Sequence, residues 1–473
     1  MAGDRYVILG LAHPRAAWFR TLAHWAHASS IPAELVKCLS AEELRARLVS
    51  GRPFSAALVD GRVAALDRDL IDEVRRAGCP TLVVEDRRGS RDWLALGAAG
   101  LLVDGFDRQQ LLDVLAAHAT LIGSGDLVPG TVEDVVPPPP GGAAVAVCGP
   151  GGTGTSTIAI ALSQGLADGV RSGVVRPSDD HTGGDATRAA VLLADLARRA
   201  EQSMLHDARD VVPGVQELVE AHRHSQLGPE SIVSLTFYVV ERGYHLLLGL
   251  RRSSAWAGIR PRAFEAAFAS LRRTFRTVVS DVEADMEGER DGGSLEVEER
   301  NIMSRTATGQ ADVVLVVGQP GMKGIHSLAG VVDDLVGFGV PVDRVLPVIN
   351  RAPRSRRARA ELASALAALV GSRQEPTPGA GDPRTLPASA LDRAGLASPI
   401  FVAERRIEEY LRDGVRLPSQ MTTPLAGAVA ALVDRRGWRV PPLREPEAVV
   451  PGSLGHWGVD EPGPDAGSEA ALG

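Results

Sequence analysis

Residues 5 to 122 alternate short apolar runs with amphipathic stretches. Five of the apolar runs are bounded by polar or turn-forming residues, which favours strands. They are YVILGL (6–11), AELVKCL (33–39), AALVD (56–60), TLVVED (81–86) and GLLVD (100–104). Stretches with helical periodicity, such as AEELRARLVSG and DRQQLLDVLAAHATLIG, separate them. Strands alternating with helices are typical of βαβ units, so we expect a parallel, flavodoxin-like sheet here.

A second series of apolar runs begins at Ala143 and predicts a second α/β sheet. Its strands are expected at 144–148, 189–196, 244–250, 275–282, 311–319, 344–350 and 398–403. Between the two series stands VEDVVPPPPGG (132–142), whose four prolines cannot enter the interior of a helix or a sheet. The sequence therefore predicts a first domain over 1–124, a proline-rich linker over 125–142, a second domain over 143–441, and a disordered acidic Pro/Gly tail over 442–473.

The composition is that of an ordinary globular protein, with 44% apolar and 23% charged residues among 473. The net charge of -8 disfavours a role for the whole protein as a polyanion binder. Cys38, Cys79 and Cys148 are scattered in apolar runs without metal or disulfide spacing, which fits a reducing cytoplasm. We find neither an apolar run long enough to span a membrane nor a signal-peptide pattern, and expect a cytoplasmic protein.

A glycine-rich turn joins a predicted strand to a predicted helix in AVAVCGPGGTGTSTIAIALSQGLAD (144–168). Its glycines let the backbone turn tightly and bring several N–H groups to one phosphate, and the helix beginning near Thr155 adds positive potential. Against the pattern GxxxxGK[ST], the turn matches from Gly149 to Gly154. Thr155 stands where lysine belongs, and Ser156 stands where a hydroxyl coordinates magnesium. The sequence thus predicts an anion site that lacks its lysine.

The same turn resembles the deviant Walker A motif of the MinD/ParA family of P-loop ATPases, which reads KGGxGK[ST]T. In PGGTGTST (150–157), proline stands at the first lysine and threonine at the second. The resemblance covers roughly 143–438. It includes VLLADLARRAEQSMLHD (191–207), similar to the family's switch segment, and RTVVSDVEAD (276–285), similar to its Walker B strand. It implies a P-loop NTPase doubly wound sheet.

The resemblance also implies ATP and Mg²⁺ as ligands and assigns roles to matching residues. The phosphate-binding residues would be Gly151, Gly152, Thr153, Gly154, Thr155, Ser156 and Thr157. Ser156 and Asp281 would hold Mg²⁺, and Asp195 would orient water in any hydrolysis. Asn350, at the end of a strand reading NR, would face adenine.

The missing lysines change what this site is expected to do. Each would supply a charge-assisted contact of about 1.5–3 kcal/mol, so the loss of one lysine should weaken ATP binding roughly tenfold to a hundredfold without abolishing it. Hydrolysis depends more on positioned cations, and loss of one of arginine-finger kind lowers the rate by about 10³–10⁵. Other cations that could replace the charge are Arg171, Arg176 and Lys323. We expect a weak or silent ATPase.

A purely structural interpretation stays open. The glycines could serve close packing, residues 155–157 could merely cap the helix, and Asp195 and Asp281 could cap strand ends.

The first domain resembles a degenerate response-regulator receiver. Asp60 ends the third strand, where a phosphoacceptor would lie. However, LGLAHP (9–14) lacks the acidic pair for magnesium, and Asp104 and Gly105 occupy the region of the phosphoryl-stabilising lysine. An isolated aspartate at a strand end is more often a cap or turn residue, so that role is favoured and phosphorylation of Asp60 is left open.

A receiver-like domain, a proline linker and a MinD-like domain together resemble CpaE/TadZ proteins, which localise secretion and pilus-assembly machinery, and actinobacterial septum-site proteins of similar layout. The resemblance implies a homodimeric spatial regulator, recruited to a pole or septum, that acts through pilus, secretion or division proteins. One alternative is a ParA-like partitioning ATPase that binds DNA. The other is a nucleotide-free scaffold protein.

The DNA alternative depends on NRAPRSRRARAELASALAALVG (350–371), which has five arginines between Arg351 and Arg359. A solvated helix start is the simpler interpretation, and a polyanion or membrane-surface contact is the functional one. No aromatic residue interleaves the arginines, so DNA binding is not favoured. The acidic C-terminus lacks a basic amphipathic helix, and a direct membrane anchor is not expected.

Overall fold

The computed structural model describes residues 5–14, 16–27, 30–50, 52–86, 91–122, 141–171, 190–208, 210–288, 294–371 and 395–435. The tail over 442–473 lies outside the described residues, as does all but the end of the expected linker. Arg176 lies outside them too. The domain boundaries expected from the sequence therefore stay a prediction.

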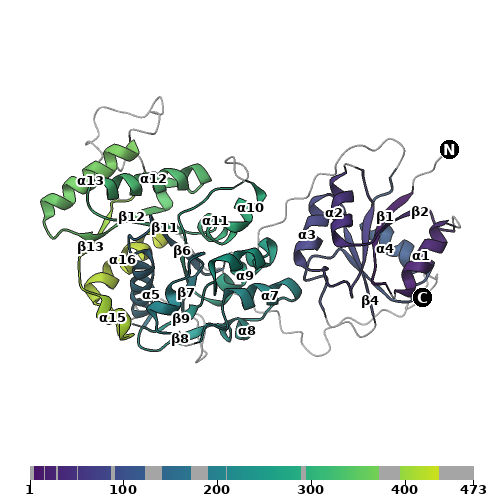
Figure 1. The fold of residues 1–473 in the computed structure, drawn as a ribbon, viewed down its shortest axis with the longest axis horizontal. Helices are drawn as coiled ribbons and strands as arrows, with labels where there is room; N and C mark the ends of the chain where they lie inside the picture. Colours follow the sequence, from purple (N-terminus) through teal and green to yellow (C-terminus); the bar gives the residue numbers. More distant parts are fainter. Residues whose placement is uncertain are drawn as a thin grey trace, which may run out of the picture. The chain divides into compact units, whose positions relative to one another are not determined.

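Five parallel strands form the first sheet, in the order β2-β1-β3-β4-β5 (Figure 1). They are β1 (Tyr6–Leu11), β2 (Ala33–Cys38), β3 (Ala56–Asp60), β4 (Thr81–Glu85) and β5 (Gly100–Val103). This is the strand order of flavodoxin-like and receiver domains. The fold class expected for this part of the chain is confirmed.

Helices cover both faces of this sheet. On one face lie α1 (Ala17–His27) and α4 (Arg108–His118), and on the other α2 (Ala41–Val49) and α3 (Arg68–Arg76). Neighbouring strand residues serve opposite faces, so Ile8 and Leu9 belong to different halves of the core. The alternation of strands and helices is incomplete between β4 and β5, where the described residues 91–99 form turns and Trp93 fills the space beside the sheet.

The second sheet has eight strands in the order β13-β12-β11-β6-β10-β7-β9-β8. They are β6 (Ala143–Cys148), β7 (Val191–Asp195), β8 (Phe237–Val239), β9 (Tyr244–Leu247), β10 (Thr277–Asp281), β11 (Val313–Gly318), β12 (Val345–Ala352) and β13 (Ile400–Ala403). All pairings are parallel except that of β8 with β9. The expected doubly wound α/β sheet is confirmed, with β8 as an unpredicted antiparallel edge strand.

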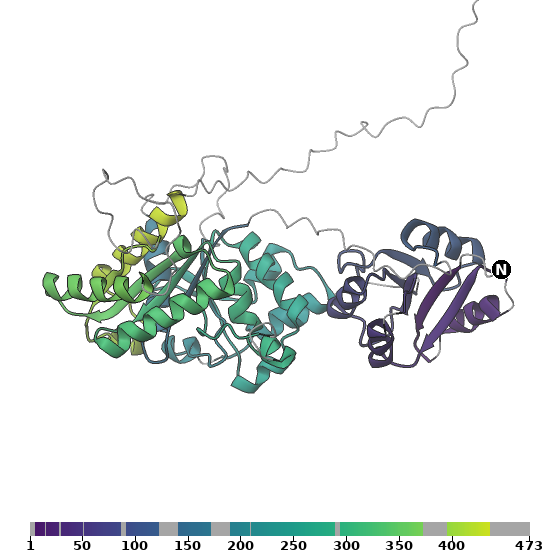
Figure 2. The same ribbon diagram turned by 90° about the horizontal axis from the view of Figure 1, so that it is seen from above.

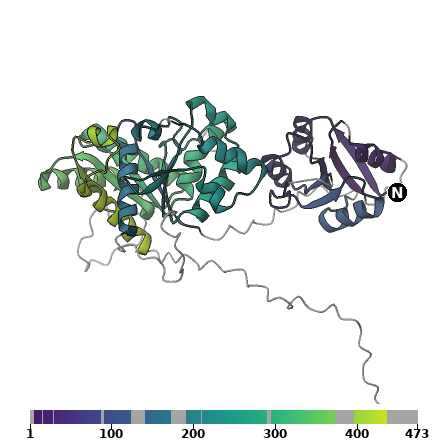
Figure 3. The same cartoon turned by 90° about the horizontal axis from the view of Figure 1, so that it is seen from below.

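One face of this sheet is covered by α5 (Thr155–Arg171) and α16 (Ser419–Arg435), which pack against each other (Figure 3). The close approach depends on Gly165, because a Cβ there would lie 2.5 Å from the Thr422 carbonyl oxygen. The other face carries α7 (Val215–His224), α9 (Pro261–Thr274), α11 (Ile302–Gly309), α12 (Met322–Phe338) and α13 (Arg356–Gly371). Shorter helices are α6 (Gln202–Leu205), α8 (Pro229–Val233), α10 (Leu295–Arg300) and α15 (Glu408–Arg412).

The parallel arrangement gathers the predicted site residues at one edge of the sheet. In a doubly wound sheet, ligands bind outside the carboxyl ends of the strands. Here the turn after β6, the last residues of β7 and β10, and Asn350 near the end of β12 all lie at that edge. No described helix is long and apolar enough to cross a membrane.

Candidate functional site

The turn between β6 and α5 needs its glycines. Gly152 and Gly154 have φ values of 78° and 88°, in the left-handed region where a side chain is strained. A Cβ on Gly149 would lie 2.3 Å from the Val317 carbonyl oxygen, and one on Gly154 would lie 2.5 Å from Nδ2 of Asn350. The glycine pattern is therefore set by backbone conformation and by close packing against β11 and β12.

The turn also keeps open space and free donors. A Cβ on Gly151 or Gly152 would meet nothing within 4 Å. Within the described part of the chain, the backbone N–H groups of Gly152, Gly154 and Thr155 find no acceptor. The helix that starts at Thr155 runs for 17 residues, so its N-terminus contributes positive potential. These are the elements of an anion-binding turn.

Two side-chain amides hold the turn from outside. Gln319 Nε2 donates to the Gly152 carbonyl oxygen at 2.7 Å, and Asn350 Nδ2 donates to the Thr153 carbonyl oxygen at 2.9 Å. The Asn350 Oδ1 atom accepts from the backbone N–H of Arg351 at 2.9 Å. Both amides fix the carbonyl groups of the turn without any ligand. The adenine contact expected of Asn350 stays a prediction.

The threonine at the lysine position does not restore the missing charge. Thr155 Oγ1 lies 3.2 Å from Thr153 Oγ1, which donates to the Pro150 carbonyl oxygen at 2.8 Å. Arg171 was a candidate replacement, but it ends α5, sixteen residues after Thr155 and so about 24 Å along the helix. It is paired there with Asp168. Arg171 is thus wrong as a substitute cation, whereas Lys323 is exposed at the start of α12, shortly after Gln319.

A buried pair of carboxylates lies beside the turn. Asp195 and Asp281 end the adjacent strands β7 and β10 and are register partners. Burial, followed by the charge of Asp281, raises the pKa of Asp195 well above its ordinary value. Burial also raises the pKa of Asp281 to about 6, while hydrogen bonds from Ser156 and Gln202 act in the opposite direction. Ser156 and Asp281 therefore lie close together, and the magnesium role expected of them stays a prediction.

Gln202, which the sequence reasoning missed, bridges this pair. Its Nε2 donates to Asp281 Oδ2 at 2.7 Å and to the Ser156 carbonyl oxygen at 3.3 Å, and its backbone N–H donates to Asp195 Oδ2 at 2.9 Å. The side chain is fully buried. The available signal was a polar residue in the segment 191–207, but periodicity could not show that it turns inward.

The donor set fits a magnesium ion only in part. The Ser156 hydroxyl and the Asp281 carboxylate are oxygen ligands of the kind Mg²⁺ prefers, and Asp195 Oδ1 is buried with no described partner. Against this, the Gln202 amide already donates to Asp281. Among the described residues, no group of three or more His, Cys, Asp and Glu side chains could hold a metal. A magnesium ion would therefore rely on phosphate oxygens for its remaining ligands.

In the first sheet, both carboxylate oxygens of Asp60 are already used. Asp60 is 1% exposed, and Arg62 donates to it from its backbone N–H, Nε and Nη2 at 2.9, 3.0 and 2.9 Å. Trp18 Nε1 donates to Oδ2 at 3.2 Å. Burial raises the pKa of Asp60, but hydrogen bonds from Arg62 and Trp18 outweigh it and lower the pKa below its ordinary value. Asp60 accepts a hydrogen bond from the backbone N–H of Arg62, two residues further along the chain. This is the turn role that the sequence favours for Asp60.

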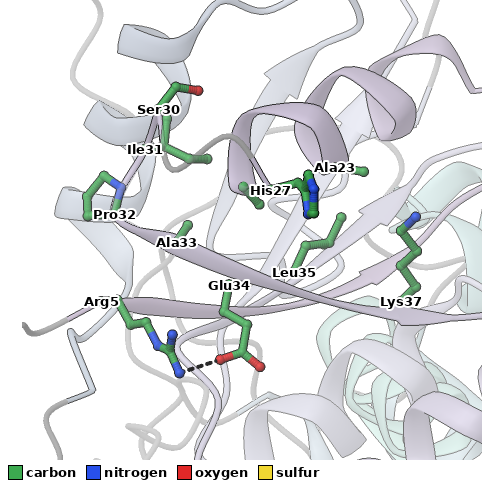
Figure 4. A pocket seen from close by; sticks show the side chains of 11 residues that line it. Arg5, Ala23, His27, Ser30, Ile31, Pro32, Ala33, Glu34, Leu35 and Lys37 are labelled. Atoms are coloured by element: carbon green, nitrogen blue, oxygen red, sulfur yellow. Dashed lines mark ion pairs between the residues drawn. The ribbon is translucent and has the colours of Figure 1, made fainter. Parts of the chain in front are cut away.

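A cavity of about 930 Å³ lies between α1 and β2 in the first sheet (Figure 4). His27, Leu35 and Lys37 are among its lining residues, and an ion pair of 2.7 Å joins Arg5 and Glu34 at its edge. It contains none of the predicted site residues. Its charged groups offer neither a nucleophile with a base nor a metal-ligand set, so the turn after β6 remains the candidate site.

No protein-family model matches this chain, and no curated protein matches it. Solved structures resemble its parts. A ParA family ATPase from Chlorobium tepidum TLS is 13% identical over 60% of this chain and 98% of its own, with a TM-score of 0.42. The cell division ATPase MinD of Pyrococcus furiosus is 18% identical over 62% and 99%, with a TM-score of 0.39. A response regulator receiver protein from Pseudomonas putida is 24% identical over 24% and 98%, with a TM-score of 0.21. At these identities the likeness concerns the fold alone.

Proposed function

We propose that this chain is a spatial regulator of MinD/ParA type whose P-loop binds ATP and Mg²⁺ weakly. The nucleotide acts as an assembly ligand for a homodimer rather than as a fuel. The proposed place of action is the cytoplasm at a pole or septum, where the protein positions pilus, secretion or division proteins.

One observation carries this proposal: the turn after β6 keeps unpaired backbone donors below open space. Gly152 is required by its φ of 78°, but Gly151 has neither a left-handed φ nor a close neighbour, so packing does not account for it. The supporting residues Ser156 and Asp281 lie at the same strand edge. Backbone amides and a helix N-terminus bind phosphate without a lysine, at lower affinity.

Slow or absent hydrolysis follows from the same residues. Pro150 has neither a charge nor a backbone N–H to offer, and the Thr155 hydroxyl is directed to Thr153. The raised pKa of Asp195 favours its protonated form, which is poorly suited to orient an attacking water. We expect turnover about 10³–10⁵ below that of an ATPase with its cations in place.

Titration calorimetry of the full chain with ATP and Mg²⁺ tests nucleotide binding. The blocking variant is Gly151→Glu, because the added side chain meets no protein atom near its Cβ and brings negative charge to the turn. Gly154→Arg is unsuitable, since its φ and its contact with Asn350 would distort the fold. Gly258→Glu, at a position equally open, is the matched control. Binding by the wild type and Gly258→Glu but not Gly151→Glu is expected; equal heats from all three would contradict the site.

A nucleotide-free scaffold is the second candidate, and the Gln202 contact favours it. The Gln202 amide occupies Asp281 Oδ2, the atom a magnesium site would use. If nucleotide displaces this amide, Gln202→Ala should bind Mg²⁺ and ATP several-fold more tightly than the wild type. Absence of heat from both proteins would establish the scaffold. Turnover equal to that of an ordinary ATPase would contradict the regulator as stated.

Imaging of a fluorescent fusion in the native host tests the spatial role. A polar or septal focus that Gly151→Glu disperses is the expected result. A nucleoid pattern would favour the partitioning alternative.

A further inference from the structure

Arg351 is held close to the turn after β6 by two hydrogen bonds of its neighbour Asn350. Both residues belong to β12, which pairs with β11 and β13 in the second sheet (Figures 1 and 2). Asn350 Nδ2 donates to the Thr153 carbonyl oxygen at 2.9 Å, and the backbone N–H of Arg351 donates to Asn350 Oδ1 at 2.9 Å. Because the oxygen and nitrogen of one amide are about 2.2 Å apart, the Arg351 nitrogen lies within about 8 Å of the Thr153 carbonyl oxygen. An arginine side chain is long enough to span a distance of this order.

The end of β12 is irregular at Arg351. Ile349 and Ala352 pack into the core on the same face of the sheet, although regular alternation would put residues three apart on opposite faces. The register with β13 shifts between these two residues, because β12 has one residue more than β13 there. An inserted residue of this kind, a β-bulge, is over-represented next to active sites, where it re-aims a side chain. The Arg351 side chain is accordingly exposed, while the residues on either side of it in the chain are buried.

The backbone conformation of Arg351 is unfavourable for its residue type. Its φ is 52°, in the left-handed region, where glycine is unstrained and most side chains are not. Among the described residues other than glycine, Asp207 is the one other with a positive φ. Strained residues are concentrated at binding and catalytic sites. A glycine would fit this position better, so the stability of the fold does not account for an arginine here.

The guanidinium of Arg351 is available to a ligand, because it forms no ion pair with another described residue. Lys323, the other exposed cation considered for the turn, lies on α12 and is connected to the turn through Gln319, four residues earlier in the chain. Arginine also offers two parallel N–H donors that fit phosphate, whereas lysine binds phosphate as a point charge. Arg351 is therefore the better-placed cation.

We propose that Arg351 supplies positive charge that this turn lacks at its lysine positions, by donating hydrogen bonds to the phosphate groups of the bound nucleotide. This inference rests on the proposed function, because it concerns the same site. The backbone N–H groups of the turn and the Arg351 guanidinium then bind the phosphates together. Because the charge comes from β12 and not from the start of α5, it adds affinity without restoring the positioned lysine that hydrolysis needs.

Titration calorimetry of the full chain with two ligands tests this role. The ligands are ATP and inorganic tripolyphosphate, each with excess Mg²⁺, and tripolyphosphate has the phosphates without the base. Arg351→Gly removes the guanidinium and suits the φ of 52°. We expect this variant to bind both ligands about tenfold or more weakly than the wild type. Arg351→Lys keeps the charge and should lose less affinity.

Two controls separate binding from folding and from net charge. In urea without ligand, Arg351→Gly should unfold at the same concentration as the wild type or at a higher one, because glycine relieves the strained backbone. Arg354→Ala removes an exposed arginine three residues further along the chain that also lacks an ion pair with a described residue. This variant should bind both ligands as the wild type does.

Four outcomes would contradict the inference, and they have different meanings. Equal affinities of the wild type and Arg351→Gly for both ligands would remove the role of Arg351 and leave the proposed function in place. Weaker binding of ATP alone would assign Arg351 to the base instead of the phosphates. Equal weakening in Arg354→Ala would assign the effect to net charge. Absence of heat from the wild type with either ligand would remove the proposed function, and this inference with it.

Discussion

Asp195 and Asp281 stand opposite each other in register at the ends of two adjacent parallel strands, and both are buried. Two carboxylates in this position repel each other when both are ionised, and burial adds a desolvation cost. The pair is therefore a source of instability that its hydrogen bonds from Gln202 only partly offset. Unfavourable electrostatic interactions of this kind are common at ligand-binding sites.

Replacing Asp195 by asparagine should stabilise the protein at pH 8. The folded pKa of Asp195 is raised, so the folded state keeps a proton that the unfolded chain releases above pH 4. The contribution of Asp195 to the free energy of unfolding is therefore largest at low pH and decreases as the pH rises. The introduced amide cannot ionise, and its oxygen can still accept from the backbone N–H of Gln202. Urea unfolding of Asp195→Asn should show a higher free energy of unfolding than the wild type at pH 8, and this gain should shrink towards pH 4.

The control for this prediction is Asp195→Ala. It removes the charge but leaves the Gln202 backbone N–H without its acceptor, so it should gain less than the asparagine variant or lose stability. An asparagine variant no more stable than wild type at pH 8 would mean that the two carboxylates do not repel as argued.

His206 should make stability depend on pH in the opposite direction. Its Nδ1 lies 2.7 Å from the Gln202 carbonyl oxygen and its Nε2 lies 2.7 Å from the Tyr244 hydroxyl. Burial lowers the pKa of His206 to about 4, from 6.5. Between pH 6.5 and 4, His206 binds a proton in the unfolded chain but not in the folded chain. The free energy of unfolding therefore falls as the pH drops from 6.5 to 4. The loss should be about 1–3 kcal/mol, measured by urea unfolding across this window.

His206→Gln isolates this effect. A glutamine side chain does not ionise between pH 4 and 6.5. The free energy of unfolding should therefore depend less steeply on pH in this range, while other groups keep their contributions. An unchanged slope would assign the acid sensitivity to other residues.

The strand pattern predicted from the sequence was sufficient for both sheets, because a parallel, doubly buried strand is a continuous apolar run. The family resemblance paired Ser156 with Asp281, and the two residues lie close together at one edge of the sheet, but their role as magnesium ligands stays a prediction. The strand pattern missed β8, a partly exposed strand of three residues, although its sequence FYV is apolar and favours a strand. A run this short gives too few residues for a pattern, and β8 is defined by its antiparallel pairing with β9.

The contacts made by three residues near the two sites could not be predicted from the sequence, for a different reason. Gln202, Gln319 and Arg62 act through contacts that depend on how the chain returns to itself. Periodicity tells which face of a helix is apolar, but a short helix such as α6 and the loops have too few residues for a period to appear. Arg62 was the nearest to being predictable, because it follows Asp60 by two residues.

Asp60 should resist phosphorylation by small phosphodonors. Both carboxylate oxygens accept hydrogen bonds from Arg62 or Trp18, and an attacking oxygen must first lose them. Incubation with acetyl phosphate and Mg²⁺, followed by intact-mass spectrometry, should show no phosphoryl adduct on the wild type. Arg62→Ala should lower stability by about 1–2 kcal/mol because a buried carboxylate loses its main donor. A stoichiometric adduct at Asp60 in the wild type would make this domain a working receiver.

Two glycines in helices should respond to alanine with opposite signs. At Gly165 a Cβ would press on the Thr422 carbonyl oxygen, and Gly165→Ala should force α5 and α16 apart and cost about 2 kcal/mol or more. At Gly330, in α12, a Cβ meets nothing within 4 Å, and Gly330→Ala should stabilise by about 0.5–1 kcal/mol. Thermal unfolding of both variants checks the pair. Equal changes would show that the α5–α16 contact is loose.

The donors of the turn after β6 belong to the main chain. A substitution removes a backbone N–H only when it introduces proline, whereas almost any substitution of a lysine removes its charge. An anion site built on main-chain donors can therefore persist when the side chains around it change.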